Sequence, residues 1–500
     1  MLEKLQSGKY HAIADLEEKA AAKLQRLNDE QRAMHGAVVD LLMNFNPKEG
    51  KLMIRMIGYA GTGKTFTLNR IVESCVLRDS SMVFAMTAPT NKAVRVLRKN
   101  CENPDFFEFG TIHSLLGLEQ RINDFTGEVT YEAEYASMRS KIIRLDECDA
   151  LVVDESSMLD PVLFSKLLVY LQRRNIPVLF VGDDAQIPPV GFKSSPVFSE
   201  HSVQEHNMLT YYLTRIMRQG EGSEIIQYAT FIRQNLRYLT HNQFNIDPSM
   251  KALQILPKDR SSYPIIKELF TSNEFRNDPD YCKVLAYRNV EVRKFNTLIR
   301  QFYHGEENLP KVVEGDLLVA DSPILGPQNS SGLKSILVSK SEEMEVTRCK
   351  VISREYSYQD FQDDKSTETT IKTVSITSYQ TEVTISDISS NKFRSQIINI
   401  VHESDEGYLM ALKNNLADKI KKSCPPALRK TMWKSLFQLR DCFADVTHNY
   451  AITVHKSQGS TYTHCISNEW DIQNNSEVEE RNRIKYVAAT RAKETLFLVR

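Results

Sequence analysis

Short apolar runs recur through the first part of the chain, and each is followed by a polar or glycine-containing turn. They occupy Leu52–Ile57, Met82–Met86, Leu151–Val153 and Val178–Val181. Short apolar runs bounded by turns are typical of buried strands. After the first run, apolar residues recur at helical spacing over Phe66–Val72. Strands that alternate with helices predict a parallel sheet flanked by helices, which is an α/β fold.

The second half of the chain has a different pattern. Lys283–Tyr287 is again a buried strand before a helical segment, which predicts a second βα unit. Between residues 311 and 410, Val, Ile, Thr and Tyr alternate with charged residues, as in half-exposed strands. Residues 358–367 are polar and are predicted to form a loop. Residues 408–445 have helical apolar spacing on either side of Cys424–Pro426, which predicts a pair of helices with Trp433 in their core.

The composition of the chain indicates the class of protein and the cellular compartment to which it belongs. The chain has 500 residues, of which 41% are hydrophobic and 25% charged, and this suits a globular protein of several domains. Its eight cysteines are scattered without a C-x-x-C pair, which argues against a disulfide framework or a zinc site and for a reducing, intracellular compartment. No apolar run reaches the length of about 18 residues that a membrane span requires. The net charge of −1 means that any basic surface is offset by acids elsewhere.

Residues 58–65 fit the phosphate-loop pattern G-x-x-x-x-G-K-[ST] at every fixed position. Glycines let the backbone N–H groups face nucleotide phosphates, and the following helix adds the positive end of its dipole. We expect Lys64 to reach the β- and γ-phosphates and the Thr65 hydroxyl to bind Mg²⁺. A glycine turn before an ordinary helix is the alternative, which the full match disfavours. The candidate nucleotide-binding residues of the loop are Gly58, Ala60, Gly61, Thr62, Gly63, Lys64 and Thr65.

Two other predicted strands end in polar residues that suit the same chemistry. Asp154 and Glu155 follow the third strand. In phosphate-loop ATPases an Asp at such a position holds Mg²⁺, and a neighbouring Glu can polarise the attacking water. Gln186 lies in the proline-containing turn after the fourth strand, where its amide can approach the γ-phosphate. Paired acids are also common on surfaces, and the Gln186 turn can be purely structural.

Gln31 lies near the start of a helix that precedes the first strand, for which Asn28 or Asp29 fits the N-cap. Its amide offers a donor and an acceptor to an adenine edge. A capped surface helix without a ligand is the alternative. At the exit from the first α/β domain, Arg215 and Arg218 are either solvated charges or arginine fingers for a phosphate.

Residues 119–133 are predicted to form a β-hairpin, with Phe125 at its turn. An exposed aromatic residue there can stack on a base. Pro89 and Thr90 follow the second strand and can begin a helix, and His113 lies shortly before the hairpin. Taken alone, each of these three residues is more often structural than functional.

In chain order, these motifs resemble those of superfamily 1 helicases of the 5′→3′ branch, the RecD-like and Dda-like enzymes. The resemblance extends from Leu27 to Arg500. Its most specific parts are His455–Gly459 and Ala489–Arg491 near the end of the chain. The matching segments are Leu27–Gln31, Gly58–Thr65, Thr87–Ala93, Thr111–Leu116, Asp154–Met158, Gly182–Val190, Leu213–Gln219, Ala451–Ser460 and Tyr486–Lys493.

The resemblance implies roles for individual residues. Gln31 would read adenine and Gln186 would sense the γ-phosphate, while Arg218, preferred to Arg215 for its motif position, and Arg491 would stabilise the phosphoryl charge. Phe125 would be a wedge on a separation pin. The residues that would contact DNA are Pro89, Thr90, His113, Phe125, His455, Lys456 and Ser457.

The resemblance also implies an architecture and an activity. The fold would be two RecA-like α/β motor domains with an inserted pin hairpin, an enlarged SH3-like β-domain and a helical tower. The expected activity is an ATP- and Mg²⁺-dependent helicase that moves 5′→3′ on single-stranded DNA and unwinds duplexes. A translocase that displaces proteins and a nucleotide-gated binding or loading protein stay open as alternatives. The expected segments are 1–26 (helical lead-in), 27–220 (first RecA-like domain), 221–310 and 446–500 (second RecA-like domain), 311–407 (β-domain) and 408–445 (tower).

The same resemblance implies partners. These are single-stranded DNA and duplex junctions, with a single-strand binding or replication protein as a further partner. A membrane is not expected as a partner, and the enzyme is expected to be a monomer in the cytoplasm, either cellular or phage-encoded.

Overall fold

The computed structural model describes residues 20, 22–116, 118–122, 129–133, 147–217, 223–238, 244–328, 334–363, 368–386 and 393–500. The chain divides into two compact units. The first contains residues up to Leu118, from Ala133 to Val292 and from Ile452 to Arg500, and the second contains Glu119–Glu132 and Arg293–Ala451. Most of the predicted helical lead-in, and the hairpin turn at Phe125, lie outside the described residues.

Six strands form the first sheet of the first unit: β1 (Met53–Gly58), β2 (Phe84–Ala88), β3 (Phe107–Thr111), β6 (Ala150–Val153), β7 (Val178–Gly182) and β8 (Leu209–Leu213). Their order is β3-β2-β6-β7-β1-β8, and all neighbouring pairs are parallel. The four apolar runs of the sequence form the four fully buried strands, as predicted. β3 and β8 are edge strands whose half-exposed residues give no continuous apolar run.

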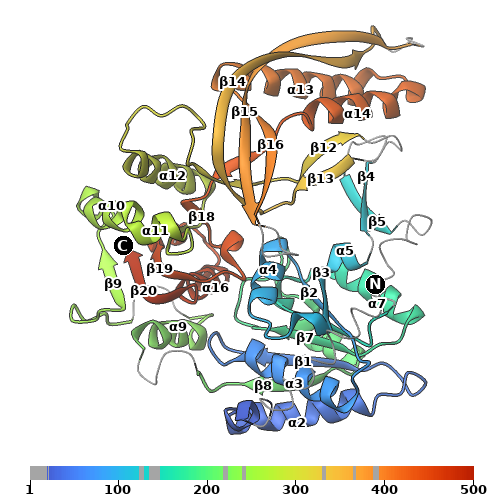
Figure 1. Ribbon diagram of the computed structural model, residues 1–500, viewed down its shortest axis with the longest axis vertical. Coiled ribbons are helices and arrows are strands. Elements are labelled where there is room, and N and C mark those ends of the chain that lie inside the picture. The colour runs from blue at the N-terminus through green and yellow to red at the C-terminus, as the bar shows by residue number, and fades with distance from the viewer. Residues whose placement is uncertain are drawn as a thin grey trace. The chain divides into compact units, whose positions relative to one another are not determined.

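Helices cover both faces of this sheet (Figure 1). On one face, α2 (Asp29–Met43) and α3 (Lys64–Arg78) share a core that contains Ile54. On the other, α7 (Pro161–Arg173) packs on a core that contains Met53, because successive strand residues point to opposite faces. The shorter helices are α4 (Asn91–Lys99), α5 (Ile112–Leu115) and α8 (Glu200–Glu205).

A second sheet of the first unit has the order β18-β10-β19-β20-β9, and the pairs β10–β19, β19–β20 and β20–β9 are parallel. Its strands are β9 (Leu253–Leu256), β10 (Cys282–Ala286), β18 (Ala451–Thr453), β19 (Tyr462–Ser467) and β20 (Ala492–Val499). Its helices are α9 (Glu224–Gln234), α10 (Tyr263–Thr271), α11 (Asn273–Asn277), α12 (Asn289–His304), α15 (Glu469–Ile472) and α16 (Val478–Ala489). Two helix-flanked parallel sheets confirm the predicted pair of RecA-like domains.

The second unit is built on a five-stranded sheet with the order β16-β15-β14-β11-β17, whose paired strands are antiparallel. Its strands are β11 (Leu317–Ala320), β14 (Glu343–Asp360), β15 (Thr370–Ser386), β16 (Phe393–Val401) and β17 (Val446–His448). Two strand pairs complete the unit, namely β12 (Ile324–Gln328) with β13 (Lys334–Val338) and β4 (Leu118–Ile122) with β5 (Val129–Ala133). The second pair is the hairpin expected around residues 119–133.

The long strands β14 and β15 pair from Met344↔Ile385 to Asp360↔Thr370 and form a two-stranded ribbon. The predicted loop over residues 358–367 is therefore wrong for its first three residues, which continue β14. They stay in the ladder because Phe361, which follows directly, is buried in a core with Trp433 and holds the ribbon end in place.

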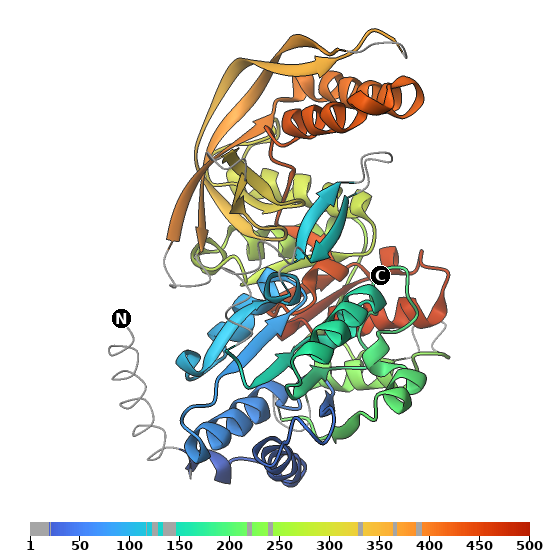
Figure 2. The ribbon, with the colours of Figure 1, turned by 90° about the vertical axis from the view of Figure 1, so that its right-hand side faces the viewer.

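The predicted helical pair is α13 (Glu403–Ser423) and α14 (Pro426–Arg440). α13 begins before the predicted residue 408 because His402 caps its first turn, with the side chain accepting from the Ser404 backbone N–H. Trp433 is 4% exposed, so its predicted place in the core is confirmed. Figure 2 shows the β14–β15 ribbon curving over the two helices. In the part of the chain that the structure describes, no helix is long and apolar enough to cross a membrane.

Candidate nucleotide site and nucleic-acid surface

The strand ends of the first sheet and the final helix of the second meet in one cleft of the first unit. Its open volume is about 1240 Å³. Parallel strands place their carboxyl ends at the same edge of a sheet, so β1, β6 and β7 deliver their following loops to this cleft. The candidate residues that line it are Ala60, Gly61, Gly63, Lys64, Thr65, Asp154, Glu155, Gln186 and Arg491. The structure thus brings together residues that the sequence separates by more than 400 positions.

Gly63 ends the phosphate loop in the left-handed conformation, with φ of 79°, immediately before α3. A Cβ atom at this position would lie 2.6 Å from Nε2 of Gln31, so glycine is required on both counts. Lys64 Nζ donates to the carbonyl oxygens of Gly58 (2.7 Å) and Tyr59 (3.1 Å). The loop carbonyls therefore hold the ammonium group beside the phosphate loop. When a nucleotide binds, phosphate oxygens would replace these carbonyls as its partners.

The strand-end acid Asp154 lies in an environment that disfavours its charged form. Burial, together with the charge of Glu155, raises the pKa of Asp154 to about 7, and Lys64 acts in the opposite direction. Asp154 accepts one hydrogen bond, from the Glu155 backbone N–H at 2.9 Å. Glu155 has φ of 49°, a conformation that is uncommon for a non-glycine residue and is often found at functional sites.

Several features of the cleft fit a magnesium nucleotide. Gln186 is 5% exposed, and its Oε1 has no hydrogen-bond partner among the described residues. A buried amide oxygen without a partner is costly unless a ligand or water satisfies it. Thr65 and Asp154 offer the hydroxyl and carboxylate oxygens that Mg²⁺ prefers, beside a lysine for phosphate.

Gln31 has a structural role in this conformation. Its Oε1 accepts from the Asn28 backbone N–H at 3.1 Å, while Asn28 Oδ1 accepts from the Gln31 N–H, which is a complete capping box. Its Nε2 donates to the carbonyl oxygen of Thr62 at 2.9 Å. The predicted adenine reader is therefore a 1% exposed side chain that ties α2 to the phosphate loop.

The two candidate arginine fingers differ in what the structure shows. Arg491 is 5% exposed and donates to the carbonyl oxygens of Val487 (3.1 Å) and Ser460 (3.0 Å) at the wall of the cleft. Arg218 lies outside the described residues. Met217, the residue before it, donates its N–H to the carbonyl oxygen of Gly61 at 2.8 Å, so the chain that leads to Arg218 is held at the phosphate loop.

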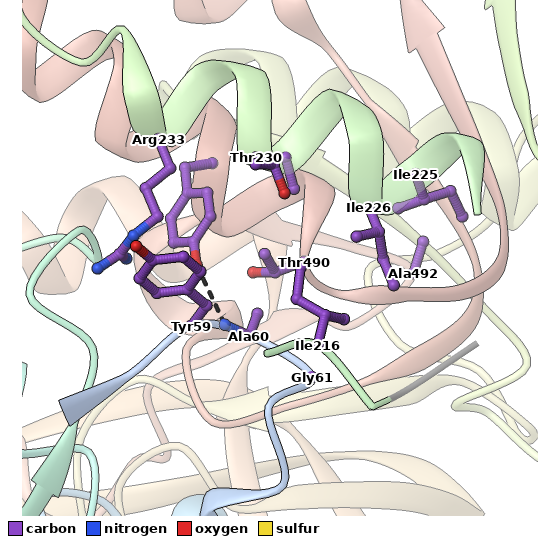
Figure 3. A pocket seen from close by; sticks show the side chains of 12 residues that line it. Tyr59, Ala60, Gly61, Ile216, Ile225, Ile226, Thr230, Arg233, Thr490 and Ala492 are labelled. Carbon is purple, nitrogen blue, oxygen red and sulfur yellow. Dashed lines mark hydrogen bonds between the residues drawn. The ribbon is translucent and has the colours of Figure 1, made fainter. Parts of the chain in front are cut away.

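A buried polar cluster links the phosphate loop to both walls of the cleft, and the motif analysis did not single it out. The Tyr486 hydroxyl accepts from the Ala60 N–H at 3.2 Å and donates to Asp183 Oδ2 at 2.7 Å. Arg233 on α9 pairs with Asp183 and Asp184. Figure 3 shows Arg233 beside the Tyr59 ring, with the guanidinium 3.9 Å from the ring centroid, and the bond to Ala60 as a dashed line.

The proton of Tyr486 is firmly held in this cluster. Burial and the adjacent Asp183 raise the pKa of the tyrosine well above its usual value. A signal for Tyr486 was present in the sequence, because it begins the motif Tyr486–Lys493, which also contains Arg491. Arg233 lies in no matched motif and could not be found that way.

Two more contacts hold the loop that contains Gln186. Arg483 on α16 donates to the carbonyl oxygens of Asp184 (2.5 Å) and Gln186 (3.0 Å). Gln458 Nε2 donates to the carbonyl oxygen of Ile187 at 3.1 Å. Together with Tyr486 and Arg233, these side chains hold the loop after β7 from the domain of the second sheet.

The candidate DNA contacts fall into two places. Pro89 and Thr90 follow β2, and His113 follows the neighbouring β3, so these three lie at the same edge of the first sheet. Thr90 caps α4, with its hydroxyl accepting from the Ala93 N–H at 3.2 Å. Burial lowers the pKa of His113, which favours its neutral form.

The second place is the turn after β18. His455 lines a hollow with Pro188, Pro189 and other residues of the loop after β7, and burial lowers its pKa. Lys456 is exposed. Ser457 is fully buried, and its hydroxyl donates to the carbonyl oxygen of Val454 at 2.7 Å, so it holds the turn rather than facing solvent.

Two family models match the chain where the cleft residues lie. A model described as an AAA domain matches residues 46–192, and one described as a UvrD-like helicase C-terminal domain matches residues 448–499. The ATP-dependent DNA helicase Dda of Enterobacteria phage T4 is 24% identical over 471 residues, which are 90% of this chain and 95% of Dda. The chain is similar to superfamily 1 helicases of the branch that contains Dda, Pif1 and RecD.

Other proteins are also similar to this chain. An uncharacterised protein of Acanthamoeba polyphaga mimivirus is 25% identical over 91% of this chain and 97% of its own length. The ATP-dependent DNA helicase Pif1 of a Psychrobacter species is 26% identical over 60% of this chain and 43% of its own length. A solved structure of Pif1 from Candida albicans aligns with a TM-score of 0.45 at 16% identity, covering 95% of this chain and 94% of that one.

Proposed function

We propose that this protein is an ATP-dependent DNA helicase that moves 5′→3′ along single-stranded DNA and separates duplexes ahead of it. The observation that carries the proposal is the cleft of the first unit, where Lys64, Thr65 and the strand-end acids face Arg491 from the second sheet. A nucleotide in this cleft would touch both RecA-like domains. Its hydrolysis can therefore change their relative position, which is the requirement for a motor.

The residues divide the chemistry of hydrolysis between them. Lys64 would bind the β- and γ-phosphates in place of the loop carbonyls of Gly58 and Tyr59. Glu155 would orient and polarise the attacking water. Thr65 and Asp154 would hold Mg²⁺, which when bound neutralises charge on the phosphates. Arg491 and Arg218 would stabilise the charge that develops on the transferring group, and Gln186 would respond to the γ-phosphate.

The contacts of the loop after β7 supply a route from the nucleotide to the DNA. Gln186 lies in this loop, whose backbone is bound by Arg483 and Gln458. Gln458 directly follows the turn that contains His455 and Lys456, two proposed DNA contacts. A change at the γ-phosphate would thus be transmitted to the turn that holds the strand.

Duplex separation would use the second unit. We assign the β4–β5 hairpin as the separation pin, with Phe125 as its wedge, the antiparallel sheet as the SH3-like insert and α13–α14 as the tower. Aromatic stacking of a base contributes about 1–3 kcal/mol, which would offset part of the free-energy cost of opening a base pair at the junction.

The test is the ATPase rate of the full chain with and without single-stranded DNA or RNA, for the wild type and for Lys64→Ala. Single-stranded DNA should stimulate the wild-type rate, because the strand and the nucleotide are coupled through the loop after β7. Lys64→Ala should lose hydrolysis by more than about 100-fold, since it removes the phosphate ligand, while its affinity for single-stranded DNA stays. A rate that DNA leaves unchanged would contradict the proposal and favour a nucleotide-gated binding protein.

A further inference from the structure

The helical pair α13–α14 carries a charge that its packing does not explain. Residues 411–440 contain eight Lys and Arg residues and a single acid, Asp418, in a chain whose net charge is −1. Figure 1 shows the two helices side by side along the β14–β15 ribbon. A charge excess of this size on one supersecondary element is the signature of an anionic partner.

The acids of the pair are concentrated at the other end of α13, where they anchor it to the sheet. Glu403 accepts from the Tyr379 hydroxyl (2.7 Å) and the Lys311 N–H (2.6 Å). Asp405 accepts from the Thr377 N–H at 2.6 Å, and Glu406 pairs with Lys311 Nζ at 3.1 Å. These carboxylates are therefore not available to the cations beyond residue 411.

Lys419, Arg440 and Arg429 hold the helical pair in place. Lys419 pairs with Asp360 at 2.6 Å, Arg440 pairs with Asp441 at 2.7 Å, and Arg429 Nε donates to the carbonyl oxygen of Cys424 at 3.0 Å. They hold the pair to the ribbon and close the turn between the helices. These three contacts do not involve the remaining lysines.

Four lysines are exposed around and beyond that turn: Lys421, Lys422, Lys430 and Lys434. Lys422 is 76% exposed and lies 3.7 Å from an exposed Asp418, a pairing that contributes little. Lys421 and Lys434 form no ion pair within the ranges that the structure describes. Lys421, Lys422 and Lys434 therefore present their charge to solvent, and Lys430 is exposed beside them on α14.

The helix dipole does not account for the positions of all the basic residues in this helical pair. Lys421 and Lys422 lie in the last turn of α13, where the dipole favours cations. α14 begins at Pro426 with no acid in its first turn, and Arg429 and Lys430 lie just inside it, where the dipole disfavours cations. A sequence chosen for helix stability alone would place acids there.

We propose that Lys421, Lys422, Lys430 and Lys434 form a binding surface for the phosphate backbone of duplex DNA. The assignment to DNA rests on the proposed helicase function. Trp433, which directly precedes Lys434, is 4% exposed and stacks on Phe437, so it offers no free face to a base. Lysine ammonium groups without a stacking platform read phosphates and not bases, and a duplex presents phosphates at fixed spacing.

The support beneath this surface is rigid. Asp360 at the end of β14 binds both Lys419 and Lys372, at 2.6 and 2.5 Å. The Gln359 N–H donates to the Ser435 hydroxyl of α14 at 2.7 Å. A surface fixed in this way can hold the duplex in one orientation to the second unit, which loose side chains on a flexible arm could not do.

The experiment compares duplex and single-stranded DNA binding by the full chain and by K421Q/K422Q/K430Q/K434Q, over a range of salt. A matched control, K48Q/K51Q/K251Q/K340Q, removes the same charge from exposed lysines elsewhere. Four lost phosphate contacts should make the slope of log affinity against log salt shallower by about 3.6 for duplex DNA. Single-stranded affinity and DNA-stimulated ATPase should stay within about twofold, and the control should match the wild type.

Each other result overturns the inference. A duplex slope equal to that of the control removes the surface from DNA binding, and equal weakening on both DNA forms assigns it to the single-strand path. Binding of anionic phosphatidylserine vesicles that is lost only in the quadruple variant would make it a lipid surface. Failure of the helicase proposal is separate, because it appears as a wild-type ATPase that single-stranded DNA does not stimulate.

Discussion

At the scale of single residues, the cleft contains polar groups whose present contacts would change when a nucleotide binds. Lys64 is held by two loop carbonyls, and Gln186 Oε1 is buried without a partner among the residues described. Gln31 is fully used by the capping box and by Thr62. The loop is thus preorganised by contacts that do not include phosphate.

The first prediction concerns Gly63. Gly63→Ala should reduce nucleotide affinity about tenfold or more, because its φ of 79° costs an L-residue about 1–2 kcal/mol and its Cβ would displace Gln31. Equilibrium binding of a fluorescent ATP analogue checks this. Gly36→Ala is the control, since nothing lies within 4 Å of its added Cβ on α2. Equal affinity of the two variants would contradict the role of the left-handed turn.

A second prediction tests the cluster behind the loop. Tyr486→Phe keeps the buried ring but leaves the Ala60 N–H and the Asp183 carboxylate without a partner, at a cost of about 1–3 kcal/mol. We expect the kcat of DNA-stimulated hydrolysis to fall about tenfold, with the affinity for single-stranded DNA unchanged. Tyr238→Phe, in which an exposed ring is altered, serves as the control. A change confined to the KM for ATP would show that Tyr486 contributes to nucleotide binding and does not position the phosphate loop for hydrolysis.

At the scale of elements, the buried Asp316 organises the second unit. It accepts from Arg300 (2.7 and 2.8 Å), from the Val313 N–H (2.8 Å) and from His304 (3.0 Å). Burial alone raises its pKa, but hydrogen bonds from His304, His448 and Arg300 outweigh burial and lower it far below the usual value. This carboxylate ties α12 to the start of the β-sheet.

The sign of the pH dependence follows from that shift. A carboxyl whose folded pKa lies below its unfolded value of about 3.9 adds stability that is fully present above that value and is lost as pH falls. Asp316→Asn should therefore destabilise the second unit by about 3–5 kcal/mol at pH 7, and the difference from wild type should narrow below about pH 4.

The chain offers a selective probe for this measurement, since it contains two tryptophans and Trp433 is the one in the second unit. Urea unfolding followed by fluorescence in a Trp470→Phe background reports on that unit. Asp418→Asn, at an exposed position of the same unit, is the control. If the difference in unfolding free energy between Asp316→Asn and the wild type grew as the pH fell, the proposed role of Asp316 would be contradicted.

What the sequence could predict at this scale depends on how each element is stabilised. β1, β2, β6 and β7 are buried on both faces and show as apolar runs, whereas β3 and β8 lie at edges and do not. The end of β14 looks polar, but pairing with β15 and the burial of Phe361 keep it in the sheet. The helices α13 and α14 are visible because Leu416, Ile420 and Trp433 keep helical spacing.

The candidate site divides in the same way. Lys64, Asp154 and Gln186 follow strands within recognisable motifs, so the sequence could place them at one edge of a sheet. Arg233 acts through Asp183, a residue 50 positions earlier, and through the ring of Tyr59. Such contacts arise only from the way α9 packs, and no local pattern reveals them.

At the scale of the whole molecule, the proposed function requires that closure of the cleft around ATP drive directional movement along one strand. Arg491 on one wall and Lys64 on the other would both be needed, and the loop after β7 would couple them to the strand. A protein that only binds DNA in a nucleotide-gated manner would need neither direction nor repeated hydrolysis.

The most direct measurement is strand separation of two otherwise identical DNA duplexes, one with a 5′ single-stranded tail and one with a 3′ tail, at saturating ATP. The account predicts that the wild type opens the 5′-tailed duplex at least about tenfold faster than the 3′-tailed one, and that Lys64→Ala opens neither while still binding both. Faster opening of the 3′-tailed duplex, or opening by Lys64→Ala, would contradict it.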